Sequence, residues 1–360
     1  MTAVTQATGI VNSLTAGRLP RWATWVILAG SWAILGIVFA LVAAVSGTEF
    51  NIAAALFLGT ILFIVLIFVF ALLVEGMRQA KDRLVTALVI SAFLIALIPL
   101  ISLLFTVVSN GLPRFDLGFF GQSMRNVVGE GGGALHAITG TLLITGMATL
   151  ISVPVGLLTA IYLVEYGTGA LAKAITFFVD VMTGIPSIVA GLFAFAFFAL
   201  ILDDPGIRFG FGGSIALSLL MIPVVVRSSE EMLKLVPNEL REASYALGVP
   251  KWLTILKIVI PTSIAGITTG VTLAIARVIG ETAPLLIISG FTASMNYDLF
   301  NDRMMSLPMF VYTQYQNPGS IVQPYLDRAW AGALTLILIV MLLNLIARLI
   351  ARIFSPKLGR

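Results

Sequence analysis

The sequence contains no cysteine and a single histidine, and charged residues make up only 11% of its 360 positions. The absence of cysteine excludes disulfides and thiolate metal sites, and one histidine excludes a metal centre built from several imidazoles. The P-loop, H-E-x-x-H and G-x-S-x-G motifs are absent as well, so the chain has no P-loop for ATP and neither common hydrolase signature. We therefore expect no metal and no cofactor bound by the chain itself.

Apolar residues dominate what is present. Hydrophobic side chains account for 59% of the chain, and the mean hydropathy is +1.06. Apolar runs of about 20 residues are long enough to cross a hydrocarbon core of about 30 Å as helices. The pattern predicts an all-α polytopic membrane protein with about eight transmembrane helices, in the runs 22–45, 52–74, 84–108, 135–164, 174–202, 213–226, 264–288 and 329–354. We expect the short run 213–226 to continue as a helix beyond Arg227.

The chain divides into three predicted segments. Residues 1–21 are polar and threonine-rich, without the basic-then-apolar order of a cleavable signal, and we interpret them as a disordered cytoplasmic tail. Residues 22–83 are interpreted as an additional two-helix segment, closed by a basic connector at 75–83. Residues 84–360 would then form the main transmembrane domain.

The basic residues indicate the orientation in the membrane. Most of the 21 Lys and Arg residues fall in the termini and in every second loop, and only a few, such as Arg114 and Arg303, fall in the others. Because cytoplasmic loops carry an excess of Lys and Arg, both termini and the loop at 242–261 are predicted to be cytoplasmic. Two long loops, 109–134 and 291–328, would then lie outside; the second is either an irregular loop or a landing surface for a binding protein.

The loop at 242–261, EASYALGVPKWLTILKIVIP, is a polar and basic interruption between two long apolar runs. Its first residues are compatible with a short helix, and Gly248 permits a turn with positive φ. Pro250 fits the first turn of a second helix, which we expect Pro261 to end before the chain enters the membrane again.

Two ionisable residues fall inside an apolar run. Arg277 and Glu281 are four residues apart, which is one helical turn. Charged groups at membrane depth usually face protein, water or substrate, and the guanidinium fork suits the oxygens of phosphate. Glu281 would hold Arg277 when substrate is absent, or accept a proton from a protonated phosphate. The alternative is a structural ion pair between helices.

Prolines interrupt several runs. The sharpest break is expected at Gly184, Pro186 and Ser187, and Pro284 interrupts the seventh run. Broken helices often line a transport pathway, although a structural kink is the alternative. Two other polar features have ordinary interpretations: His136 as an interfacial side chain, and Arg227, Glu230 and Glu231 as a solvated helix end.

The loop at 242–261 resembles the EAA loop of permease subunits in ABC-type importers, whose pattern is E-A-A, three residues, G, nine residues, I-x-L-P. The spacing is kept, with Ser244 in place of the second alanine and Ile260 in place of leucine. In that family the loop docks into a separate ATPase. The resemblance implies docking roles for Glu242, Ala243, Ser244, Gly248, Ile258 and Pro261.

A narrower resemblance is carried by ARVIGETAPLL at 276–286 and GIPSIVAGL at 184–192. These segments, with SLP at 306–308 and RAWAGA at 328–333, are similar to the PstA family of phosphate importer permeases. The resemblance implies a MetI-like permease core in the bacterial inner membrane and half of a phosphate pathway. It also implies a PstC-like permease, two PstB-like ATPase subunits that bind ATP and Mg²⁺, and a PstS-like binding protein. A permease for molybdate or a phosphonate, a gradient-driven carrier and an intramembrane enzyme are the alternatives.

Overall fold

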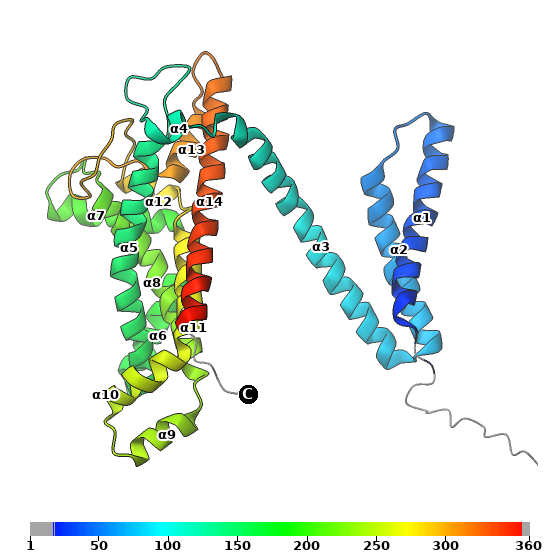
Figure 1. The fold of residues 1–360 in the computed structure, drawn as a ribbon, viewed down its shortest axis with the longest axis horizontal. Coiled ribbons are helices and arrows are strands. Elements are labelled where there is room, and N and C mark those ends of the chain that lie inside the picture. Colours follow the sequence, from blue (N-terminus) through cyan, green and yellow to red (C-terminus); the bar gives the residue numbers. More distant parts are fainter. Residues whose placement is uncertain (1–16, 18, 355–360) are drawn as a thin grey trace, which may run out of the picture. The chain divides into compact units, whose positions relative to one another are not determined.

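The computed structural model describes residues 17 and 19–354, and these residues form helices without any β-strand (Figure 1). Among them, seven helices are long and apolar enough to cross a membrane, and a bent pair of helices would supply an eighth crossing. The all-α polytopic fold class is therefore confirmed. The α-helices are α1 (Arg21–Ser46), α2 (Ile52–Val74), α3 (Met77–Gly111), α4 (Leu117–Gly121), α5 (Leu135–Ile161), α6 (Gly169–Thr183), α7 (Ser187–Ile201), α8 (Gly210–Lys234), α9 (Asn238–Ala246), α10 (Lys251–Thr254), α11 (Ile260–Val278), α12 (Ala283–Ile288), α13 (Leu307–Gln316) and α14 (Gln323–Phe354).

The chain divides into two compact units, Met1–Leu104 and Phe105–Arg360, and the division falls inside α3. The predicted boundary of the permease domain at residue 84 stays a prediction. Most of the predicted tail, residues 1–21, lies outside the described residues. The predicted connector 75–83 is shorter than expected, because α3 already begins at Met77.

In the first unit, α1 and α2 form a helical hairpin. The indole nitrogen of Trp32 donates a hydrogen bond of 3.2 Å to the Thr60 hydroxyl. Gly59 makes room for the indole, since a Cβ at this position would lie 2.7 Å from the Trp32 ring. Where α2 ends, the Arg83 guanidinium meets the Glu75 carboxylate at 2.5 Å, which fixes the start of α3 against the end of α2.

The second unit is a bundle centred on α8. This helix packs against α5, α7 and α11, and α11 packs in turn against α14. Leu217, Met221 and Val225 of α8 are inaccessible to solvent and form the middle of the main apolar core. Figure 1 shows α9 and α10 at one end of this bundle, here called the docking end, and α4 with the start of α14 at the opposite, far end.

Two of the predicted runs are not single helices. The run 174–202 is divided into α6 and α7, which meet at an angle of 109°. The run 264–288 is divided into α11 and α12, with a turn at 279–282 between them. The run 213–226 does continue beyond Arg227 as expected, because α8 reaches Lys234.

Loop segments close the far end of the bundle. The backbone N–H of Leu307 donates a hydrogen bond of 2.6 Å to the Thr141 hydroxyl of α5, and α13 begins there. The predicted outer loop 291–328 therefore contains an ordered helix. His136, interpreted from the sequence as an interfacial side chain, is only 2% exposed and packs edge-on against the Phe310 ring. That interpretation was wrong, because α13 covers this face of α5.

Candidate functional site

The loop at 242–261 forms a helix–turn–helix at the docking end. Helix α9 ends at Ala246, and Gly248 adopts a positive φ of 76°. The N–H of Val249 donates to the Ser244 carbonyl at 3.2 Å, which reverses the chain direction before Pro250 precedes α10. The predicted turn at Gly248 is thus confirmed, and its φ is one that residues with a Cβ rarely adopt.

A buried hydrogen bond joins the two short helices. The hydroxyls of Ser244 in α9 and Thr254 in α10 lie 2.8 Å apart, and both side chains are buried. Ser244 occupies the position of the second alanine of the E-A-A pattern. In this chain the serine therefore stabilises the angle between the two helices, and it is not part of the exposed surface.

A buried ion pair fixes α9 to the end of α5. The π-helical turn Tyr162–Tyr166 continues α5 and contains Glu165. The Arg241 guanidinium donates two hydrogen bonds to Glu165 Oε1, at 2.9 and 3.0 Å, and one to the Leu233 carbonyl at 3.0 Å. Lys251 donates to the Glu165 carbonyl and lies over the Tyr166 ring. The docking loop is therefore held rigidly against both α5 and α8.

Sequence reasoning missed this ion pair. In the sequence, Arg241 is one basic residue just before the loop at 242–261, and Glu165 lies 76 positions away from it. The one signal available was the acidic residue at the end of the apolar run 135–164. Glu165 has no basic partner close to it in the sequence, so its pairing with Arg241 is recognised only when α5 and α9 are placed together.

The outward surface of the docking loop is unpartnered within the described residues. Glu242, Ala243 and Gly248 are exposed, and Leu247 between them is 83% exposed. Trp252 on α10 is exposed as well. Apolar side chains exposed on a polar loop mark an interaction surface. The docking roles of these residues stay a prediction.

Pro261 does not end the second helix, which corrects the expectation from sequence. The helix is continuous over Lys251–Val278, through a π-helical turn at Ile255–Val259 that includes Ile258. Pro261 lies in the first turn of α11, directly after this turn. The π-turn shifts the hydrogen-bond register there, so the missing N–H of proline does not break the helix. One helix therefore connects the docking loop with Arg277.

The predicted break at Gly184 and Pro186 is present. Gly184 follows α6, and Pro186 precedes Ser187, the first residue of α7. The bent α7 lies against α12, and a Cβ on Gly191 would be 2.5 Å from the Pro284 Cα. The structure thus brings together the two proline-containing motifs, which are about a hundred positions apart in the sequence. Their place in a transport pathway stays a prediction.

Arg277 and Glu281 are arranged differently from the one-turn pair expected. Arg277 lies in the last turn of α11 and is exposed, whereas Glu281 follows the end of that helix and is half-buried. The Glu281 N–H donates to the Val278 carbonyl at 3.1 Å. No ion pair joins the two side chains within the described residues. The helix ends between them, so they are not neighbours on one helical face.

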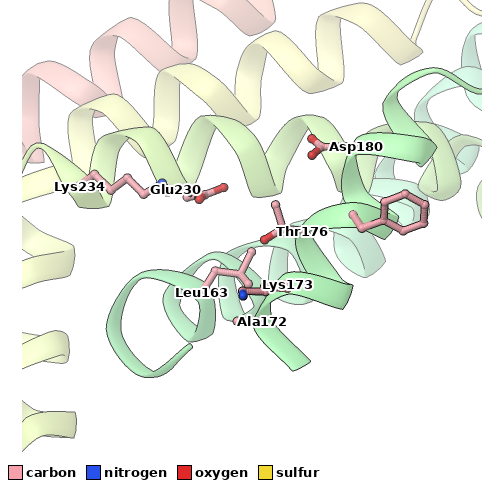
Figure 2. A pocket seen from close by; sticks show the side chains of 8 residues that line it. Leu163, Ala172, Lys173, Thr176, Asp180, Glu230 and Lys234 are labelled. Atoms are coloured by element: carbon pink, nitrogen blue, oxygen red, sulfur yellow. Dashed lines mark hydrogen bonds and ion pairs between the residues drawn. The ribbon is translucent and has the colours of Figure 1, made fainter. Parts of the chain in front are cut away.

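An ion-pair network that the sequence did not indicate lies between α6 and α8. Arg227 pairs with Asp180 of α6 and, at 2.9 Å, with Glu230, which also accepts from Lys234 at 2.7 Å. Figure 2 shows Thr176 and Asp180 beside Glu230 and Lys234, around a pocket of about 400 Å³. The interpretation of 227–231 as a solvated end was wrong for Glu230, which is buried because α6 folds back against α8.

Comparison with known families and structures agrees with this geometry. Residues 152–360 match the family of binding-protein-dependent transport system inner membrane components. Among solved structures, one chain of a bacterial alginate ABC transporter, in complex with an alginate pentasaccharide-bound periplasmic protein, is similar in fold. It is 15% identical with a TM-score of 0.54, and the match covers 78% of this chain and 97% of that one. At this identity the likeness shows the fold alone.

Curated relatives give a narrower assignment. The phosphate transport system permease protein PstA 1 of Mycobacterium tuberculosis is 48% identical over 276 residues, which are 76% of this chain and 89% of that protein. PstA of Mycobacterium leprae is also 48% identical, over 74% of this chain and 88% of that protein. PstA of Yersinia pestis is 40% identical, over 77% of this chain and 92% of that protein. The chain is a multi-pass inner-membrane component of a binding-protein-dependent ABC transport system, and it belongs to the PstA family of permeases.

Proposed function

We propose that this chain is the permease subunit of an ATP-driven phosphate importer and forms half of the translocation pathway. The relatives that match most of its length are phosphate transport permeases. The observation that carries the mechanism is the uninterrupted helix Lys251–Val278, which begins in the docking loop and carries Arg277 in its last turn. A displacement at the loop would therefore reach Arg277 through one rigid element.

The energy for transport would come from a separate ATPase, because the sequence has no P-loop of its own. ATP and Mg²⁺ would be bound by that subunit. It would dock on the exposed side of the turn, against Glu242, Ala243 and Leu247. The Arg241–Glu165 ion pair would pass the movement to α5, while the continuous helix passes it to the pathway.

Phosphate would be held transiently by Arg277. Its guanidinium is exposed on the monomer and carries no ion pair within the described residues, so its donors are free for an anion. Arg is suited to phosphate, since its planar fork matches two oxygens at once. Glu281, half-buried after the helix end, would accept a hydrogen bond from a protonated phosphate. Ser187 and the breaks at Gly184, Pro186 and Pro284 would border this pathway.

The partners would be a PstC-like permease as the other half of the pathway, two PstB-like ATPase subunits and a PstS-like extracytoplasmic binding protein. Both termini and the docking loop would be cytoplasmic, as the distribution of Lys and Arg favours. The far end of the bundle would then face the binding protein. The assembled complex would hydrolyse ATP to import phosphate.

Reconstitution tests this proposal. The chain is co-expressed with its partner permease and ATPase, the complex is placed in lipid vesicles, and the binding protein is loaded with one anion at a time. Phosphate should stimulate ATP hydrolysis, whereas molybdate and a phosphonate should not. If one of the other anions stimulates ATP hydrolysis instead, that anion is the substrate. Phosphate uptake without an ATPase subunit would identify a gradient-driven carrier.

A further inference from the structure

A buried arginine at the far end of the bundle has no acidic partner. Arg328 lies in the second turn of α14 and is 0% exposed. Its Nε donates to Gln314 Oε1 at 2.8 Å, and Nη1 donates to the carbonyls of Gly129 and Gly131 at 2.7 and 3.0 Å. Its Cζ lies 4.5 Å from the centre of the Tyr325 ring. All these partners are neutral, so none of them balances the positive charge.

One nitrogen of this guanidinium is left over. Nη2 of Arg328 is buried and has no hydrogen-bond partner within the described residues. No carboxylate of these residues forms an ion pair with Arg328. Burying a charge is costly unless an opposite charge and hydrogen bonds accompany it. The arrangement therefore lacks an anion that balances this buried charge.

Arg328 lines a pocket of about 300 Å³ that has room for such an anion. The pocket lies at the N-terminal end of α14, where the helix dipole favours negative charge. Arg114 lines it too, and its guanidinium is held by Asp116 and by the Gly132 carbonyl at 2.5 Å. The hydrogen bond from Arg114, together with the Phe119 N–H, holds the pKa of the Asp116 carboxyl below its usual range. Asp116 therefore stays ionised and keeps Arg114 beside the pocket.

Two carboxylates also line the pocket, and they restrict which anion it accepts. Glu130 is exposed and has no hydrogen bond or ion pair to any described residue. One oxygen of Asp327 accepts from Gln323 at 2.7 Å. Carboxylates repel a fully ionised anion but accept a hydrogen bond from an anion that carries a proton. Inorganic phosphate keeps at least one proton at neutral pH, whereas sulfate and the phosphodiester of a lipid headgroup keep none.

We propose that this pocket is a second phosphate site, in which Arg114 donates to the oxygens of inorganic phosphate, Glu130 accepts from its P–OH group, and the buried Arg328 guanidinium supplies the positive charge behind them. The shared chemistry is a phosphate group, and the carboxylates select free phosphate over a lipid phosphodiester. The site rests on the proposed function: it lies at the end that would face the binding protein, and Arg277 is not among the residues that line it. Phosphate would occupy it between release from the binding protein and passage to Arg277.

Binding of radiolabelled phosphate to the full complex in lipid nanodiscs tests the site. Arg277→Gln is used as the background, so that binding at the proposed pathway site is removed. Arg328 itself is left intact, because its contacts to Gly129 and Gly131 also hold the fold. Arg114→Gln should weaken phosphate binding by about tenfold to a hundredfold, the range for one charge-assisted hydrogen bond. Arg125→Gln, an exposed arginine in the same loop and outside the pocket, should leave binding unchanged.

Selectivity is measured by competition with sulfate. Sulfate should compete poorly in the parent protein, and Glu130→Gln should reduce the preference for phosphate by about tenfold or more. Equal competition by sulfate in the parent, or unchanged binding in Arg114→Gln, would overturn the proposal. Phosphate binding that appears only in discs of phosphorus-free galactolipid would also overturn the proposal. It would mean that a phospholipid headgroup occupies the pocket in the other discs and excludes free phosphate.

Uptake assays separate this inference from the proposed function. Phosphate uptake by the unmodified complex, together with no pocket-dependent binding, would reject the second site and leave the function standing. Pocket-dependent binding in a complex that imports no phosphate would reject the function and leave the site. If Arg114→Gln binds phosphate normally but no longer associates with the binding protein, the second site is rejected. The pocket would then receive a carboxylate of the binding protein.

Discussion

Gly191 of α7 and Pro284 of α12 are in backbone contact, so close that a Cβ on Gly191 would lie 2.5 Å from the Pro284 Cα. The contact joins the helix that follows the 109° bend to the short helix that follows Arg277 and Glu281. Because α7 also packs on α8, the bend, the central helix and the end of the docking helix form one connected body.

Gly191→Ala should therefore separate α7 from α12. The methyl group would meet backbone, which has no rotamer to change, and overpacking of this kind costs about 1–3 kcal/mol. We expect a lower thermal midpoint for the purified complex and reduced phosphate uptake. Gly30→Ala in α1 is the matched control, because nothing lies within 4 Å of the added Cβ there. Equal stability of the two variants would contradict the contact.

Much of the fold follows from hydropathy and proline spacing alone. The apolar runs, the break at Pro186 and the turn at Gly248 depend on local chemistry, so the sequence predicts each of them. The exposed side of the docking loop is local too, because Glu242 and Ala243 of α9 are exposed while Ser244, next to them in the same short helix, is buried.

What the sequence could not predict depends on contacts between distant segments. The Arg241–Glu165 ion pair joins residues 76 positions apart, and the unbalanced charge of Arg328 depends on which carbonyls reach it. Pro261 was expected to end a helix, but a π-turn accommodates it. Arg277 and Glu281 have the spacing of one helical turn, yet the helix ends between them; neither residue type signals that end.

Gly248 should be essential for coupling to the ATPase. Its φ of 76° is strained for a residue with a Cβ, although nothing lies within 4 Å of the position. The free-energy cost of Gly248→Val is therefore purely conformational and amounts to about 1–3 kcal/mol. The substitution would deform the turn between α9 and α10. We expect normal membrane insertion, with loss of substrate-stimulated ATP hydrolysis. Gly248→Asn should retain most activity, because asparagine tolerates this region. Full activity of the valine variant would show that the turn is only a connector.

Single cysteines can test the predicted topology, because the chain has none of its own. Leu247→Cys places a thiol at a position of the docking turn that is 83% exposed, and Asn317→Cys places one after α13 at the far end. With a membrane-impermeant maleimide added to intact cells, we expect labelling at 317 and none at 247. Lysed cells provide the control, since both positions should then react. The reverse pattern in intact cells would place the docking loop outside and exclude contact with a cytoplasmic ATPase.

Arg277→Gln should abolish most phosphate uptake without unfolding the protein. The side chain is exposed and Glu281 is not its partner in the structure, so the change leaves no buried carboxylate unpaired. It removes one charge-assisted contact to the anion, which corresponds to about tenfold to a hundredfold in transport efficiency. Arg352→Gln, which removes an exposed arginine from the last turn of α14, should transport normally.

The double variant Arg277→Gln with Glu281→Gln separates an anion site from a structural role. If Arg277 acts by holding phosphate, removing Glu281 as well cannot restore the lost donors, and uptake stays low in a complex that assembles normally. If Arg277 serves to neutralise Glu281 when the partner permease covers both, the double variant removes both charges together and uptake recovers. Uptake per assembled complex is the measurement, with thermal midpoints recorded alongside. Recovery in the double variant would end the assignment of Arg277 as the phosphate ligand of the pathway.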